Sequence, residues 1–233
     1  MPFRPPGRRG VTPGGRGGFS GFDVLDQVEY WDDVTAGAVL ARLDPGPELS
    51  FFTDYEGGIA GALFDRLLAQ DDEPKVPVLL LVDHRLATGQ TDGWRYEDLP
   101  EDTVAWRRTL ALLDDDARQR HGQGFATLPV ADQGELIGEV AGADEWHGLS
   151  AGHVWSLWTR YAATAFYSHP WAWNEIGFGG PAYPRGYSAL GVGKREHWEV
   201  PDARDSDPVS FESRVRQIEA VHRRPAGAED LGA

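Results

Sequence analysis

Residues 150–170 read SAGHVWSLWTRYAATAFYSHP, and this stretch decides the fold class. Its apolar residues recur every three or four positions, as they do along one face of a helix. They are Val154, Leu157, Trp158, Tyr161, Ala165 and Phe166. Ser150 is a suitable N-cap, and Pro170 disfavours helical geometry in the residue before it, which ends the pattern. A helix with so wide an apolar face must be buried against other elements.

Five further segments upstream show the same helical spacing of apolar residues. They are residues 23–42, 53–68, 77–89, 98–121 and 127–140. Thr53 and Glu56 have the spacing of a capping box. Gly57, Gly58 and Gly61 weaken the helix that follows, by up to about 1 kcal/mol each relative to alanine. We therefore expect another backbone to approach this helix closely.

No segment alternates apolar and polar residues over the length of a strand. The sequence therefore predicts an all-α fold: a compact bundle of about five or six helices, followed by an irregular C-terminal segment rich in aromatic residues, glycine and proline. Residues 1–21 are basic and rich in glycine and proline, and we expect a flexible arm there. Residues 22–199 are predicted to form the helical domain, and residues 200–233 a charged tail.

The composition excludes several classes of protein. The chain has 37 Asp and Glu against 22 Lys and Arg, a formal net charge of -15 at pH 7, whereas nucleic acid is bound through basic faces. It has no cysteine, which excludes disulfides, thiolate metal sites and a cysteine nucleophile. The longest unbroken apolar run, residues 78–82, is far shorter than the roughly 20 residues of a membrane helix. We therefore expect neither nucleic-acid binding nor a transmembrane segment.

Two short motifs suggest chemistry but lack its structural context. Residues 148–152, GLSAG, match the nucleophile elbow, which requires a strand before the serine. No strand is predicted there, so we interpret Ser150 as a helix N-cap, with a stand-alone enzyme that uses Ser150 as the alternative. Residues 177–182, GFGGPA, match a dinucleotide fingerprint without its strand and helix. The seven histidines show no metal-ligand spacing, and Glu219 with His222 is a single pair in the charged tail.

Residues 171–198 place aromatic side chains among glycines and prolines. Without helical periodicity, such side chains must pack on the helical body or on a second protein. We predict a partner-binding surface of aromatic anchors and one directional arginine. Its residues are Trp171, Trp173, Asn174, Phe178, Tyr183, Pro184, Arg185 and Tyr187. The alternative is that these aromatic side chains cover the chain's own helices.

Five short motifs occur together in this chain. They are residues 51–53 (FFT), 64–68 (FDRLL), 121–129 (HGQGFATLP), 167–170 (YSHP) and 176–187 (IGFGGPAYPRGY). With them, the chain resembles the gluconate 2-dehydrogenase subunit 3 family over about residues 51–198. The stretch from Tyr167 to Tyr187 is most similar to the small subunits of glucoside 3-dehydrogenase-type flavoproteins of the glucose–methanol–choline class.

The resemblance implies a non-catalytic small subunit that binds and stabilises a large FAD-dependent partner. That partner would hold FAD and the catalytic residues and would oxidise a sugar or glycoside hydroxyl at C3, so no cofactor is expected in this chain. A cytochrome c or another acceptor would receive the electrons. The loop between His169 and Ile176 is shorter than in the gluconate and fructose branches, which makes gluconate a poor guess for the substrate. A general scaffold or chaperone-like protein with several clients is the remaining alternative.

Many members of this family carry a twin-arginine export signal. Arg8 and Arg9 stand side by side here, but Val11, Thr12 and Pro13 lead into glycines without an apolar stretch. We therefore expect no cleavable signal and a cytoplasmic location, or an extracytoplasmic one if the chain is exported together with its partner.

Overall fold

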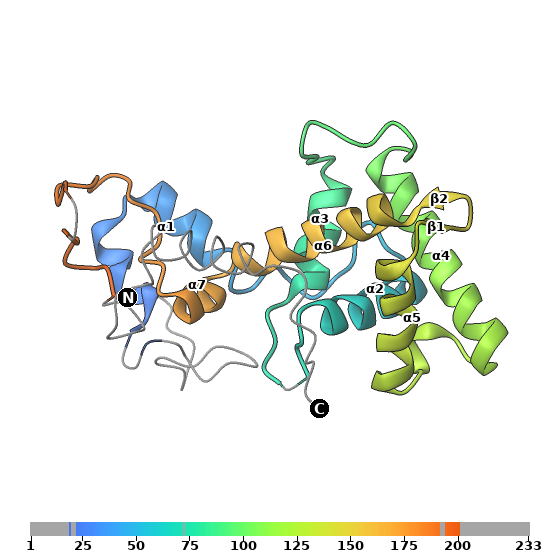
Figure 1. Ribbon diagram of the computed structural model, residues 1–233. Helices are drawn as coiled ribbons and strands as arrows, with labels where there is room; N and C mark the ends of the chain where they lie inside the picture. Colours follow the sequence, from blue (N-terminus) through green and yellow to red (C-terminus); the bar gives the residue numbers. More distant parts are fainter. Residues whose placement is uncertain (1–18, 20–21, 72, 192–193, 201–233) are drawn as a thin grey trace, which may run out of the picture. The chain divides into compact units, whose positions relative to one another are not determined.

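The computed structural model describes residues 19, 22–71, 73–191 and 194–200 (Figure 1). By its contacts the chain divides into two units, Met1–Val200 and Pro201–Ala233, and all of the second lies outside the described residues. The elements of the first unit are η1 (Val24–Tyr30), α1 (Asp33–Leu40), α2 (Asp54–Leu67), α3 (Val78–Ala87), α4 (Asp102–His121), η2 (Phe125–Thr127), α5 (Val130–Gly142), β1 (Glu145–Trp146), β2 (Leu149–Ser150), α6 (Ala151–Tyr167) and α7 (Pro170–Ile176). The predicted all-α class is confirmed. No helix in these ranges is both long and apolar enough to span a bilayer.

The larger hydrophobic core lies between α2, α3, α4, α5 and α6. Trp106 of α4 packs edge-on against Tyr161 of α6, with ring centroids 5.6 Å apart, and lies 5.4 Å from the ring of Phe64 in α2. Trp158 of α6 donates its indole N–H to the hydroxyl of Thr109 in α4 at 3.0 Å. Large aromatic side chains thus hold α4 and α6 together.

The entrance to α2 is fixed by two sets of hydrogen bonds. The predicted capping box is present, with Thr53 and Glu56 bonding each other's backbone N–H groups. Just before it, the buried carboxylate of Asp83 in α3 accepts three backbone N–H groups. The distances are 2.6 Å from Ser50, 3.0 Å from Phe51 and 2.8 Å from Phe52. Asp83 therefore ties the segment before α2 to α3.

The expected close approach of another backbone to the glycines of α2 is not found, and only one of the three glycines has a neighbour closer than ordinary contact. A Cβ atom at Gly57 would lie 2.5 Å from Cδ1 of Leu49, so a side chain there would force a shift. At Gly61 and Gly58 the nearest atoms would be 3.6 and 3.9 Å away, which is ordinary contact. The close approach also comes from a side chain and not, as expected, from a backbone.

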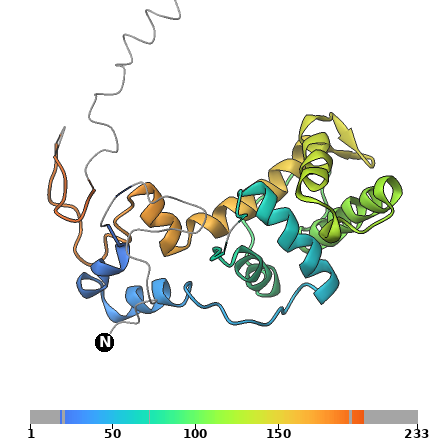
Figure 2. The ribbon, with the colours of Figure 1, turned by 90° about the horizontal axis from the view of Figure 1, so that it is seen from below.

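The prediction of one helix over residues 23–42 is wrong, because the structure has η1 and α1 separated by Trp31 and Asp32. Asp32 adopts extended geometry and accepts the backbone N–H of Thr35 at 2.8 Å, which starts α1 anew. Trp31 is buried, and its indole N–H donates to the carbonyl of Pro181 at 2.9 Å. The stabilisation from this tertiary contact outweighs the local preference for a continuous helix that the apolar spacing indicates. Residues 41–53, which follow α1, contain no helix or strand (Figure 2).

Two further expectations are corrected after residue 144. Residues 145–150 form a small hairpin that pairs Glu145 with Ser150 and Trp146 with Leu149, although no strand was predicted there. The segment after Pro170 does not begin as irregular chain, because Pro170 is the first residue of α7. Proline suits this position, since a first helical residue needs no N–H partner. Helix α7 ends at Gly177 with φ of 69°, and residues 178–191 contain no helix or strand.

A second hydrophobic cluster lies apart from the larger core. Its buried residues are Val24, Leu25, Trp31, Val39 and Trp173. Trp31 lies between η1 and α1, and the others come from η1, α1 and α7, so the cluster joins segments about 150 residues apart in the chain. We call this assembly, together with residues 177–191 and 194–200, the second cluster.

Candidate partner-binding surface

The second cluster is held together by hydrogen bonds between its distant segments. The buried amide of Asn174 accepts the backbone N–H of Val24 at 2.7 Å and donates to the carboxylate of Asp23 at 3.3 Å. The guanidinium of Arg42 donates to the carbonyl of Ser168 at 3.0 Å. The N-terminal segment is thus bonded directly to α7 and to the end of α6.

Three glycines after α7 are closely approached by side chains from the segment before α1 and from the segment that ends at residue 200. Measured to an ideal Cβ atom, the closest approaches are 2.3 Å from Gly177 to Val200 Cγ2, 2.5 Å from Gly179 to Trp198 Cδ1 and 2.4 Å from Gly180 to Trp31 Cζ2. Real Cβ atoms do not tolerate such contacts, so the backbone approach requires glycine at these positions. Among the described residues there is no strand directly before these glycines and no helix after them, so residues 177–182 lack the structural context that a dinucleotide fingerprint requires.

The segment after these glycines is fixed by two charged side chains. Arg185 donates to the carbonyl of Gly179 at 2.7 Å and to the amide oxygen of Gln27 at 3.0 Å, and its guanidinium lies 3.9 Å from the ring centroid of Trp198. Glu196 accepts the backbone N–H groups of Ser188 and Ala189. These bonds, that of Ala189 first, lower the pKa of Glu196. Residues 183–191 thus lack helix or strand but have a fixed backbone.

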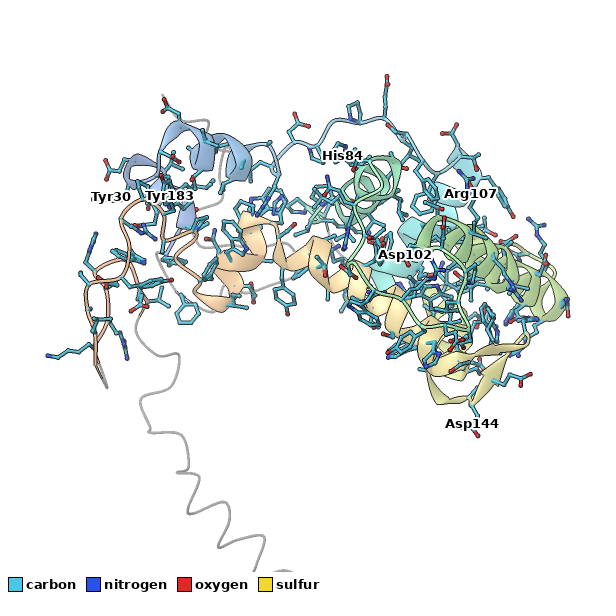
Figure 3. The ribbon with its side chains drawn as sticks, turned by 90° about the horizontal axis from the view of Figure 1, so that it is seen from above. Tyr30, His84, Asp102, Arg107, Asp144 and Tyr183 are labelled. Atoms are coloured by element: carbon cyan, nitrogen blue, oxygen red, sulfur yellow. The ribbon has the colours of Figure 1, made fainter. Side chains whose placement is uncertain are left out.

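Large apolar side chains nevertheless remain exposed on this part of the chain. Tyr183 is 66 % exposed and Leu190 82 %. Of the twelve exposed large apolar side chains in the described ranges, eight belong to η1, α1 or residues 167–190. They are Tyr30, Val34, Tyr167, Ile176, Phe178, Tyr183, Tyr187 and Leu190. Figure 3 shows Tyr30 on η1 and Tyr183 on the segment after α7.

His169, at the junction of α6 and α7, is a buried group that carries no charge at neutral pH. Its Nδ1 accepts the backbone N–H of Trp171 at 3.1 Å, which places the proton on Nε2. Burial, aided by the positive charge of Arg42, lowers its pKa to about 3. The residue acts as a neutral cap of α7 and is not positioned as a base on an accessible surface.

In the described residues, Ser150 of the alternative enzyme hypothesis has no hydrogen-bonded base beside it. Ser150 ends β2 and precedes α6, but its hydroxyl makes no capping hydrogen bond, which corrects the interpretation of its side chain as an N-cap. His153 does pair with Asp98, at 2.6 Å, and its ring stacks on Tyr96. Within the described part of the chain, no hydrogen bond joins Ser150 to His153. No group of three metal-ligating side chains is found there either.

A model of the family described as Gluconate 2-dehydrogenase subunit 3 matches residues 54–180, more than half of the chain. The chain belongs to this family. No curated protein and no solved structure matches the chain significantly. The family is named for a subunit of a dehydrogenase complex, and its matched range runs from α2 to the glycines after α7.

The second cluster lies largely outside the range that matches the Gluconate 2-dehydrogenase subunit 3 family. Helices η1 and α1 precede it, and residues 181–200 follow it. Both flanks meet at Gly177, Gly179 and Gly180, which close the matched range. In this chain, the segments before and after the matched range therefore pack against the C-terminal end of that range.

The structure divides the eight predicted surface residues into two groups. Trp173 and Asn174 are buried inside the second cluster, Arg185 is bonded within the chain, and Trp171 packs partly buried against the larger core. These four support the chain's own fold, which is the alternative that the sequence left open for the aromatic residues. Those that the structure leaves exposed are Phe178, Tyr183, Pro184 and Tyr187.

Sequence reasoning missed several exposed residues of the same surface. Tyr30 and Ile176 lie on helical elements, and an apolar residue in a helix is expected to face the core. Leu190 stands alone among small residues, so no pattern identifies it. Glu196 gives no local signal, because its role depends on backbone N–H groups seven and eight residues away.

Proposed function

We propose that this chain is the non-catalytic small subunit of a flavin-dependent dehydrogenase and that the exposed side chains of the second cluster bind the large subunit. Membership of a family of dehydrogenase subunits supports the subunit role. The observation that carries the proposal is the concentration of exposed large apolar side chains on the second cluster and the adjoining end of α6. Exposed apolar side chains that gather on one part of a chain are typical of interaction surfaces.

The fixed backbone under these side chains favours tight binding. Tyr183 and Tyr187 project from a segment that Arg185 and Glu196 already hold in place. A preorganised segment loses little conformational entropy on binding, and tyrosine is enriched among the residues that dominate interface energies. Arg185 therefore acts here by positioning the tyrosines, and not as the directional contact that the sequence suggested.

The finer assignments rest on the resemblance of residues 167–170 and 176–187 to the small subunits of one flavoprotein type. We assign the partner to the glucose–methanol–choline class, with FAD and the catalytic residues in the large subunit. Its substrate would be a sugar or glycoside hydroxyl, oxidised at C3. A cytochrome c or another acceptor would take the electrons from the complex.

The test is co-expression of the full chain with a large flavoprotein subunit of the glucoside 3-dehydrogenase type from the same organism. Size-exclusion chromatography, followed at the flavin and protein absorbances, should show one yellow complex. Replacing both Tyr183 and Tyr187 by alanine should weaken the complex at least about tenfold, as loss of central aromatic anchors does. Trp94→Ala, which removes an exposed aromatic side chain of the helical body, is the matched control and should leave the complex intact.

Two results would contradict this proposal. If the flavoprotein elutes alone and active beside a colourless small chain, the chain is not its subunit. If the complex forms but tolerates the double tyrosine variant, the binding surface lies elsewhere. Affinity purification that recovers several clients, none of them dominant or flavin-bearing, would favour a general scaffold protein.

A further inference from the structure

A recess of about 470 Å³ opens in the helical body, away from the residues of the second cluster. Its floor includes Leu86 of α3, Asp102 of α4 and Tyr161 of α6, all of which are buried. Its rim includes the exposed residues Trp94 and Glu101. Figure 3 marks Asp102 at the start of α4. The volume lies in the range of about 300–1,000 Å³ that is usual for small-molecule sites.

The loop that forms one wall is braced on both sides. The carboxylate of Asp92 bridges Arg85 of α3 and Arg160 of α6. The guanidinium of Arg160 lies 4.4 Å from the ring centroid of Trp94, and that of Arg85 lies 4.4 Å from the ring centroid of Tyr161. Of these five side chains, all but that of Trp94 are largely shielded from water. The recess is therefore formed before any ligand arrives.

The lining carries both signs of charge in balance. Arg85 and Arg95 contribute positive charge, and Glu101 and Asp102 contribute negative charge. With the charges in balance, the lining offers no net attraction to an anion or to a cation, so an uncharged ligand is not at an electrostatic disadvantage.

The remaining lining groups favour hydroxyl groups and a flat apolar face. Tyr161 donates its hydroxyl to Oδ2 of Asp102 at 2.5 Å, so only one of the two carboxylate oxygens is taken by this bond. Burial and the neighbouring Asp102 raise the pKa of Tyr161, which keeps this hydroxyl a donor. Gln90 and Thr91 on the rim can each donate and accept. Trp94, half exposed, belongs to the same lining.

We propose that this recess binds a small uncharged polyol of the size of a sugar ring. The C–H face of such a ring would stack on the indole of Trp94, and its hydroxyl groups would pair with Asp102, Glu101 and Gln90. Hydroxyl groups match this lining because each one donates and accepts a hydrogen bond. The site is separate from the surface proposed to bind the flavoprotein, and the two proposals stand or fall independently.

The test is saturation-transfer NMR on the full chain without a partner, with methyl α-glucoside as the neutral probe and gluconate as its anionic counterpart. Methyl α-glucoside should bind, and gluconate should bind at least about tenfold more weakly. Trp94→Ala should weaken methyl glucoside binding about tenfold, and Trp94→Phe should restore most of it. Tyr187→Ala, an exposed aromatic residue of the second cluster, should have no effect.

Three results would overturn the proposal. Absence of any transfer to methyl glucoside at saturating probe would show that the recess binds no neutral polyol. Binding that survives Trp94→Ala in a folded chain, checked by circular dichroism, would place the sugar elsewhere. Equal or stronger binding of gluconate would show that the balance of charges does not select the ligand.

Discussion

The buried carboxylate of Asp83 accepts backbone hydrogen bonds of a kind that a helix or strand would otherwise supply. Residues 50–52 belong to no helix or strand, and their three backbone N–H groups all bond to this one side chain. Buried N–H groups without a partner are costly, so the entrance to α2 depends on the carboxylate.

Asp83→Asn should lower the free energy of unfolding by about 2 kcal/mol, because an amide offers one acceptor oxygen in place of two and brings donors of its own. Urea denaturation measures this loss. Asp71→Asn, at the exposed end of the ion pair with Arg66, is the matched control and should change stability by no more than about 0.5 kcal/mol. A similar loss in both variants would show that Asp83 has no special role.

His169 should make the stability of the chain depend on pH in acid. The folded chain binds a proton at this residue only near pH 3, whereas the imidazole of an unfolded chain titrates near 6.5. Between these values the unfolded state binds more protons, so stability is complete above about pH 6.5 and falls as the pH drops toward 3. The loss from this residue is about 5 kcal/mol at most.

The comparison that isolates this effect is His169→Asn, whose amide oxygen can still accept the N–H of Trp171. Its unfolding free energy, measured by urea titration across the same interval, should fall less steeply with pH than that of the wild type. Parallel curves for the two proteins would mean that His169 binds its proton equally well in the folded and the unfolded chain.

At the scale of elements, glycine affects stability in opposite ways in α5 and after α7. Gly138 lies on an exposed face of α5, and a Cβ atom there would have nothing within 4 Å. Gly180 has φ of +76°, and a Cβ atom there would lie 2.4 Å from Trp31. The first glycine only weakens its helix, and the second permits the contact between the two flanks.

Alanine at these two positions should therefore change stability in opposite directions. Gly138→Ala should raise the free energy of unfolding by up to about 1 kcal/mol, since alanine is the better helix former. Gly180→Ala should lower it by about 1–3 kcal/mol through strain and overpacking against Trp31. Thermal unfolding of both variants in parallel provides the measurement, and a shared sign would refute this assignment.

At the scale of the whole molecule, the sequence predicts the helical body well because its information is local there. The helices over residues 53–68 and 150–170 have apolar residues at regular spacing and recognisable ends, and the structure contains both as α2 and α6. The second cluster could not be predicted in this way. Trp31 continues the helical spacing of its neighbours, yet its indole N–H bonds to the carbonyl of Pro181. The sequence around either residue gives no sign of this contact.

The candidate surface could be predicted only in part, because it too depends on contacts between distant segments. Aromatic residues in a segment rich in glycine and proline indicate a packing site, but the pattern does not say which of them face inward. Trp173 and Tyr183 occur in similar sequence surroundings. Trp173 is buried because it packs against residues of η1 and α1, whereas Tyr183 stays exposed.

The bonds from Asn174 to Val24 and Asp23 also set an order of events during synthesis. They join residues separated by 150 and 151 positions, so residues 22–43 leave the ribosome long before their binding site exists. Such distant contacts come late in folding, because the loop they close is long and its entropy must be lost first. The helical body between them can form earlier from its more local contacts. The second cluster, and with it the proposed partner surface, is therefore completed only when nearly the whole chain has been made.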